Sequence, residues 1–170
     1  NKIIVKLLID KGADVNIKNT KSGTTPLMYA VINNNKDIVE LLLTKNADVK
    51  IQDTYGTTPL MYAVKYANED IVELLIGKGA NVDEQDNKGI TALILAVEKG
   101  NIDIIKLLLT KNADVDIQDN YGSTPLMYAV EKGNKDIVEL LLTKNANVDI
   151  QNKTFKTTPL IYAARKGNID

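Results

Sequence analysis

Hydrophobic residues along this chain form two kinds of short cluster, and both have the spacing of helices rather than of strands. In the first kind, Leu60, Ala63 and Val64 share one face of a helix. Thr58 and Pro59 precede them as an N-cap followed by a proline at the first helical position, where its missing N–H does no harm. The pattern therefore predicts a short amphipathic helix that begins at Pro59.

The second kind of cluster predicts a helix that buries most of its circumference. Asp70 lies in its first turn, where a carboxylate favours the positive end of the helix dipole, and Lys78 in its last turn. Glu73 is the residue expected to face outward. The apolar set is Ile71, Val72, Leu74, Leu75 and Ile76. The helix pair is then followed by a short extended arm and a tight turn over residues 47–56 and their equivalents.

Both clusters recur with a period of 33 residues, once lengthened to 34. The copies of the first begin at Thr25, Thr58, Thr91, Thr124 and Thr158. A further column holds only glycine and asparagine, the residues that tolerate a left-handed helix cap: Gly12, Asn46, Gly79, Asn112 and Asn145. Because two small helices cannot bury their apolar faces alone, neighbouring units must stack into an all-α repeat solenoid.

The period, the helix pair and the Thr-Pro-Leu-x-x-Ala string resemble the ankyrin repeat across essentially the whole chain. The resemblance implies stacked helix-turn-helix repeats joined by β-hairpin-like turns, in a single domain over residues 1–170. Full repeats are expected at 19–52, 53–85, 86–118 and 119–151, with partial repeats at 1–18 and 152–170. Since neither partial repeat has a polar cap, we expect exposed apolar faces at both ends, which would permit end-to-end self-association.

The chain departs from the family pattern where relatives carry histidine in Thr-Pro-Leu-His. The residues here are Met28, Met61, Ile94, Met127 and Ile161. We therefore expect apolar packing in place of the polar network that the histidine supports. Ala92 replaces a proline, and Lys156 replaces a turn glycine.

Composition removes several kinds of chemistry. Histidine and cysteine are absent, which excludes Ser-His-Asp triads, cysteine nucleophiles and structural zinc sites. The formal net charge of −1 gives no indication of nucleic acid, and no apolar run approaches the roughly 20 residues that span a bilayer. The lack of cysteine suits a reducing, intracellular location, which we take to be the cytoplasm. No cofactor, small-molecule substrate or enzymatic activity is expected, since the carboxylates are distributed one per repeat.

The resemblance implies that the chain binds another protein through turn tips and the concave face of the first helices. Those columns vary between repeats while the framework columns do not. Aromatic residues at tips are typical of binding hot spots. The predicted partner-binding residues are Tyr55, Tyr66, Lys88, Ile90, Lys99, Tyr121, Lys132 and Phe155. The alternative is that the segment is a structural spacer of a longer array with no partner of its own.

Two further columns are interpreted as structural. Asp53, Asp86 and Asp119 are expected to accept hydrogen bonds from the backbone of their own turns. A second column of tyrosines is expected to pack between repeats with the hydroxyl at the rim. It consists of Tyr29, Tyr62, Tyr128 and Tyr162. A calcium loop beginning at Asp116 is rejected, because Met127 stands where a bidentate Glu is needed.

Overall fold

The computed structural model describes residues 1–167, so the last three residues of the partial repeat predicted at 152–170 lie outside the described part. Ten α-helices and no strands occur within these residues, and they form an all-α repeat solenoid. The helices are α1 (Lys2–Asp10), α2 (Pro26–Ile32), α3 (Lys36–Thr44), α4 (Pro59–Lys65), α5 (Glu69–Gly77), α6 (Ala92–Lys99), α7 (Ile102–Thr110), α8 (Pro125–Lys132), α9 (Lys135–Thr143) and α10 (Pro159–Lys166).

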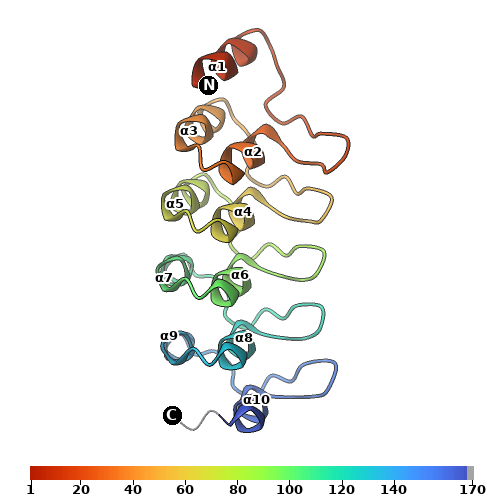
Figure 1. The fold of residues 1–170 in the computed structure, drawn as a ribbon, viewed down its shortest axis with the longest axis vertical. Helices are drawn as coiled ribbons and strands as arrows, with labels where there is room; N and C mark the ends of the chain where they lie inside the picture. The colour runs from red at the N-terminus through yellow and green to blue at the C-terminus, as the bar shows by residue number, and fades with distance from the viewer. Residues whose placement is uncertain (168–170) are drawn as a thin grey trace. The chain divides into compact units, whose positions relative to one another are not determined.

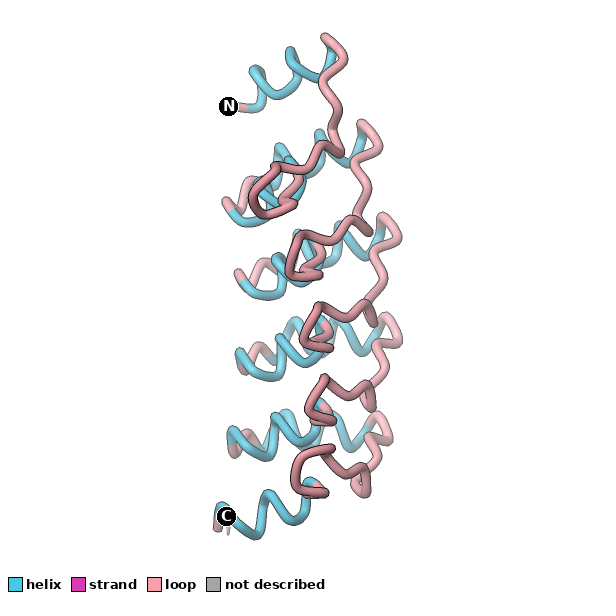
Figure 2. Tube along the Cα trace, turned by 90° about the vertical axis from the view of Figure 1, so that its right-hand side faces the viewer, coloured by secondary structure: helices cyan, strands magenta, loops and turns pink. Residues whose placement is uncertain are grey.

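The chain divides into two compact units, Asn1–Asn81 and Val82–Asp170. Helices α1 to α5 belong to the first unit and α6 to α10 to the second. Within each unit the two helices of a repeat lie side by side, and the tip loops project away from them (Figure 1). The loops follow one another along the same side of their unit (Figure 2).

Each first helix begins directly after its predicted threonine N-cap, and in α2, α4, α8 and α10 proline follows that threonine. In α4 the amide of Met61 donates to Oγ1 of Thr58 over 3.1 Å, and the amide of Thr58 approaches the Met61 sulfur at 3.5 Å. This satisfies one orphan amide of the first turn and places the methionine against the cap. Ala92 in place of proline does not alter the start of α6, which is capped by Thr91 in the same way.

The second helices are capped by asparagines that the sequence analysis did not single out. Asn68 Oδ1 accepts the amide of Ile71 over 2.9 Å, and equivalent asparagines cap α3, α7 and α9. Asp70 lies in the first turn as predicted. Lys78 stands one position beyond the helix as its C-cap rather than in the last turn, and the left-handed residue follows it. All five residues of the glycine and asparagine column have positive φ, from 59° to 89°.

The core of the first unit lies between its helix layers. Helices α2 and α4 pack together, and each also packs on the second helix of its own repeat. Met28 and Met61 are 0 and 1% exposed, so apolar packing at the position of the family histidine is confirmed there. The other fully buried large side chains of this unit are Leu27, Leu60, Ile71 and Leu75.

The second unit repeats this arrangement, with α8 packed between α6 and α10 and against α9. Ile94 and Met127 are buried at the histidine position. Ile161 is an exception at 50% exposure, because it lies on α10 and no described helix covers that face. The other fully buried large side chains are Leu93, Ile104, Ile105, Leu108 and Leu126.

The terminal helices expose the apolar side chains that the sequence analysis expected to be exposed. No residue of α1 is buried, and Ile3 and Leu7 are 71 and 59% exposed. On α10, Leu160 is 76% exposed. Self-association through these faces stays a prediction.

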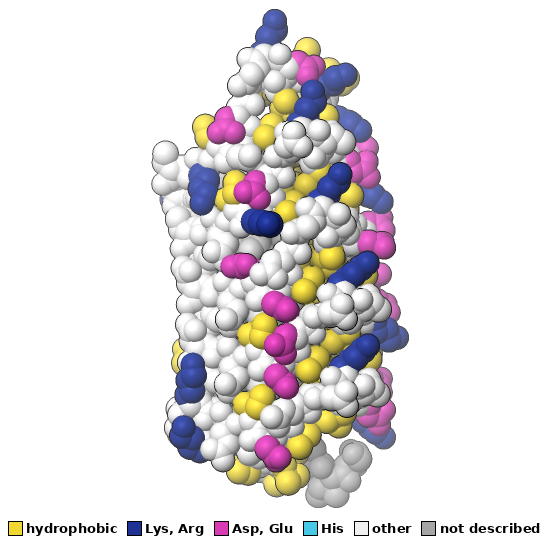
Figure 3. Space-filling model, turned by 180° about the vertical axis from the view of Figure 1, so that it is seen from behind, with side chains coloured by type: hydrophobic (Ala, Val, Ile, Leu, Met, Phe, Trp, Pro, Cys, Tyr) yellow, Lys and Arg dark blue, Asp and Glu magenta, His cyan; other side chains and the backbone are white. Residues whose placement is uncertain are grey.

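Ion pairs connect neighbouring repeats at the surface of the first unit. Lys36 Nζ lies 2.8 Å from Asp70 Oδ2, and this bond raises the pKa of the Lys36 ammonium. Lys2 and Asp37 form the equivalent pair one repeat earlier, at 3.1 Å. Viewed from behind, lysine and acidic side chains are both exposed, and the two kinds lie next to one another along the right-hand edge (Figure 3). Because these pairs are solvent-exposed, we assign them a minor part in stability.

Candidate functional site

Each tip is a tight turn held by a polar side chain, which is buried in Asp53, Asp119 and Asn152 and half-buried in Asp86. In the first unit Asp53 is 7% exposed, and its Oδ1 accepts the amides of Tyr55 and Thr57 over 2.8 and 2.9 Å. A main-chain bond from Gly56 to Asp53 closes the turn. The interpretation of this aspartate column as turn-forming is therefore correct, and the side chain of Tyr55 is left to point outward.

In the second unit Asp119 has the same role and is 2% exposed. Its Oδ1 accepts the amides of Tyr121 and Ser123 over 2.9 and 2.7 Å. Asp86 makes the same two bonds, to Lys88 and Ile90, over 2.8 and 2.9 Å. The last tip uses Asn152 in place of aspartate.

The framework tyrosines extend this arrangement in a way that sequence reasoning missed. Tyr62 donates its hydroxyl proton to Asp53 Oδ2 over 2.6 Å, and Tyr128 donates to Asp119 Oδ2 over 2.7 Å. The two residues are nine positions apart in each repeat, and that recurrence was the available signal. Each hydroxyl therefore secures the turn of its own repeat.

Burial raises the pKa of the Tyr62 and Tyr128 phenols well above their ordinary value, and the bond to aspartate raises it further. Both side chains are half-buried, in line with the packing expected of this column. Tyr29 differs: it is 47% exposed, and its hydroxyl accepts from Asn19 Nδ2 over 2.6 Å. Tyr29 is therefore exposed rather than packed between repeats, and the expectation is wrong for this member of the column.

The predicted partner-binding residues of the first unit are both exposed. Tyr55 is 70% exposed at the tip, and Tyr66 is 48% exposed as the C-cap of α4. The ring of Tyr55 takes no part in the turn. Asp53 bonds to the main-chain amides of Tyr55 and Thr57 and not to the Tyr55 side chain.

The six predicted residues of the second unit lie on tips and at helix ends. Lys99 and Lys132 are the exposed last residues of α6 and α8. Lys88 is exposed at its tip and Ile90 is half-buried. Tyr121 and Phe155 are 67 and 74% exposed. Of the six, the structure brings Tyr121 and Phe155 to one hollow.

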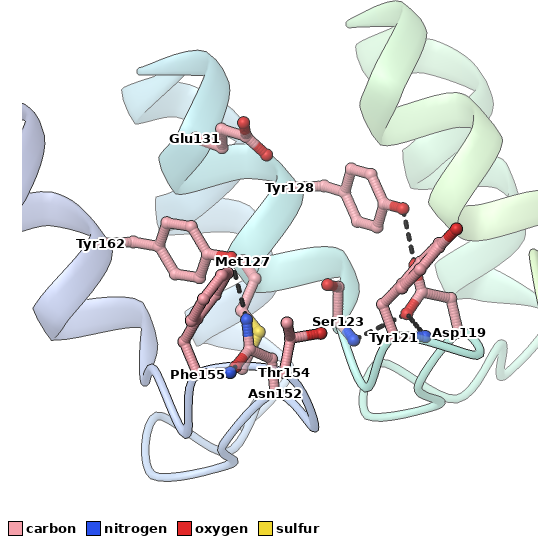
Figure 4. A pocket seen from close by; sticks show the side chains of 10 residues that line it. All are labelled: Asp119, Tyr121, Ser123, Met127, Tyr128, Glu131, Asn152, Thr154, Phe155 and Tyr162. Atoms are coloured by element: carbon pink, nitrogen blue, oxygen red, sulfur yellow. Dashed lines mark hydrogen bonds between the residues drawn. The ribbon is translucent and has the colours of Figure 1, made fainter.

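That hollow has a volume of about 330 Å³ and lies between the last two tips of the second unit (Figure 4). Tyr121 and Ser123 border it on one side, and Thr154 and Phe155 on the other (Figure 4). The remaining lining residues are Asp119, Met127, Tyr128, Glu131, Asn152 and Tyr162. Sequence reasoning named the two aromatic tips but not the hollow.

Within residues 1–167, no group of three or more acidic side chains is placed to hold a metal ion. None of the helices in that range is both long enough and apolar enough to cross a membrane.

Comparison with known proteins agrees with the fold. A family model described as ankyrin repeats (3 copies) matches residues 1–86 and 74–152. No curated protein matches the chain. The matched residues contain the capped helix pairs and left-handed caps described above, and they cover most of the sequence. This chain therefore belongs to the ankyrin-repeat family.

Proposed function

We propose that this chain is a protein-binding module that holds its partner through turn tips and the exposed ends of first helices. Ankyrin repeats are generally protein–protein interaction modules. The proposed contact residues are Tyr55 and Tyr66 in the first unit, and Lys88, Ile90, Lys99, Tyr121, Lys132 and Phe155 in the second. The exposed aromatic rings at three tips are the observation that carries the proposal.

Comparison of the tips supports this choice, because the turn itself needs no aromatic side chain. Lys88 occupies the column of Tyr55 and Tyr121, and its amide makes the same bond to the turn aspartate, over 2.8 Å. The fold therefore accepts a lysine at this position. An exposed ring there brings the turn no packing, whereas large aromatic side chains are enriched among residues that dominate binding energy.

The same reasoning separates the tips from the framework tyrosines. Tyr62 and Tyr128 bond to buried aspartates, so their replacement would disturb the turns. Tyr55, Tyr121 and Phe155 donate to their turns only through main-chain amides. Truncating these three side chains should leave the fold intact, which makes them suitable probes of binding.

The test is affinity capture from lysate of the source cells with three baits, read by mass spectrometry. The baits are the natural chain, its Tyr55→Ala/Tyr121→Ala/Phe155→Ala variant, and a control variant altered at exposed positions of second helices. The control substitutions are Glu73→Ala, Lys106→Ala and Glu139→Ala. Circular dichroism melting of all three baits establishes that the fold is retained.

We expect a protein that the natural and control baits retain and the triple-alanine bait loses by tenfold or more, on the order of the effect of removing hot-spot residues. Identical recovery by all three baits would contradict the proposal and favour the spacer function. Our proposal further takes residues 1–170 as a single, non-enzymatic, intracellular domain of the cytoplasm.

A further inference from the structure

The tips of the second unit place two exposed aromatic side chains on consecutive repeats. Along the chain the tip column reads Ser22, Tyr55, Lys88, Tyr121 and Phe155, so aromatic residues are adjacent at its last two positions. Tyr121 and Phe155 both border the hollow of about 330 Å³. Main-chain atoms hold the two tips together, since the amide of Lys153 donates to the Tyr121 carbonyl over 2.8 Å.

The walls of the hollow are aromatic and its base is made of buried side chains. Tyr128 and Tyr162 add two further rings from α8 and α10, behind the tips (Figure 4). At the base, Met127 and Asn152 are 2 and 3% exposed. The Asn152 side chain donates to the Tyr162 hydroxyl over 3.0 Å, which fixes that ring relative to the turn. The Tyr128 and Tyr162 rings are therefore held by side-chain hydrogen bonds to the turns behind the exposed rings of Tyr121 and Phe155.

The charged residues that line the hollow are both acidic. They are Asp119 and Glu131, and none of the lysines or arginines within residues 1–167 lines it. None of the ion pairs found among residues 1–167 involves either carboxylate. Tyr128 donates its hydroxyl proton to Asp119, so its oxygen presents lone pairs as acceptors. The hollow thus offers π faces, the Glu131 carboxylate and the Tyr128 hydroxyl oxygen as an acceptor.

Two cationic side chains of α10, Arg165 and Lys166, lie next to residues that line the hollow. The Arg165 guanidinium stands 5.1 Å from the centre of the Tyr162 ring, within the distance for a cation–π interaction. Lys166 Nζ donates to the main-chain oxygen of Glu131 over 2.6 Å, and not to its carboxylate. The Tyr162 ring therefore already attracts a cation. The Glu131 carboxylate has no ion pair within residues 1–167.

We propose that this hollow receives a lysine or arginine side chain of the protein partner, with the charged group between the aromatic tips and Glu131. The inference rests on the proposed function and gives the chemistry of the group that the partner presents. A cation gains from ring faces and carboxylates together. An acidic side chain would meet two like charges, and an apolar one would desolvate Glu131 without compensation.

The experiment is an NMR titration of the ¹⁵N-labelled chain with four blocked pentapeptides. Each has glycine at the flanking positions and lysine, arginine, norleucine or glutamate at the centre. We expect saturable amide shifts at Tyr121, Ser123, Thr154 and Phe155 with the lysine and arginine peptides only. Norleucine is the matched control, because it keeps the aliphatic stem of lysine without the charge.

Variants then assign the site. Phe155→Ala should weaken binding of the lysine peptide about tenfold, the scale of a cation–π contact. Glu131→Gln should weaken it about threefold, the scale of an exposed ion pair. Glu73→Gln, on α5 in the other unit, should change nothing. Lysine and norleucine peptides of equal affinity, or a Glu131→Gln variant that binds like the natural chain, would overturn the inference.

The two experiments distinguish failure of the cation-site proposal from failure of the proposed protein-binding function. If the tip variant loses its captured protein but the chain shows no preference for basic peptides, the binding function stands and the cation site is wrong. If no protein depends on the tips in capture, the proposed function fails whatever the peptides do.

Discussion

The hydroxyl of Tyr128 donates a 2.7 Å hydrogen bond to Oδ2 of Asp119, whose other carboxylate oxygen holds the tip that carries Tyr121. A framework side chain on α8 therefore sets the position of a tip. The carboxylate is 2% exposed, so its three bonds replace the water that it loses on folding. The equivalent pair in the first unit is Tyr62 with Asp53.

Removing this hydroxyl should destabilise the second unit. The Tyr128→Phe substitution keeps the ring and leaves one oxygen of a buried carboxylate without its donor, which costs about 1–2 kcal/mol in the free energy of unfolding. Urea denaturation followed by circular dichroism measures it. Tyr29→Phe is the matched control, because Tyr29 bonds to an asparagine and is 47% exposed. An equal loss in both variants would contradict the special role of the buried aspartate.

The raised pKa values of Tyr62 and Tyr128 predict a loss of stability in alkali. The folded chain keeps these protons above the ordinary pKa of 10.0, while the unfolded chain releases them. The native state then binds more protons, so the contribution of these two tyrosines to the free energy of unfolding is fully present below pH 10 and is lost as pH rises above it.

Urea denaturation across this pH range checks the alkaline loss. The Tyr62→Phe/Tyr128→Phe variant lacks both groups and should show a shallower fall above pH 10, although it is less stable at neutral pH. Parallel curves for the variant and the natural chain would show that other groups cause the loss.

One repeat lacks the tyrosine, and restoring it should stabilise the chain. Asp86 holds its turn like the other aspartates, but Leu95 stands in the tyrosine column. In the Leu95→Tyr variant the new hydroxyl can donate to Asp86, and we expect a gain of about 1 kcal/mol in the free energy of unfolding. Leu95→Phe controls for the ring, so the gain should be absent there.

Local features of the fold were predictable, whereas features that join two turns or two repeats were not. Thr58 and Pro59 mark a helix start by their own chemistry, and the left-handed Asn46 follows from its residue type. The asparagine caps such as Asn68 were readable from the same kind of column and were overlooked. The exposed tips followed from variation between repeats, and the exposed fractions agree.

The tyrosine–aspartate bond recurs at a spacing of nine residues, but the spacing alone does not show that the two side chains meet. Asp119 and Tyr128 meet because the turn folds back over the start of α8, a path that hydrophobic periodicity does not describe. The hollow depends further on the spacing between Tyr121 and Phe155, which lie on different repeats. Sequence patterns assign each residue to its own repeat and give no distance between neighbouring tips.

Consecutive tips of the second unit approach each other closely at Gly122. Gly122 has a φ of 81°, and a Cβ at this position would lie 2.6 Å from the main-chain nitrogen of Lys153. Gly133, at the C-cap of α8, has a φ of 68° and nothing within 4 Å of such a Cβ. Both alanine substitutions force a side chain into the left-handed region, but only the one at the tip pushes on the next turn.

Because main-chain atoms cannot move aside as a flexible side chain can, Gly122→Ala should lower the free energy of unfolding by about 3 kcal/mol, against about 1 kcal/mol for Gly133→Ala. Urea denaturation of both variants measures the difference. Gly122→Ala should also move Tyr121 away from Phe155 and so weaken binding of the lysine peptide. Gly133→Ala should leave the affinity for this peptide unchanged. Equal stability losses in the two variants would show that glycine is needed at the tip only for its left-handed backbone conformation. Contact with the next turn would then not be a reason for the glycine.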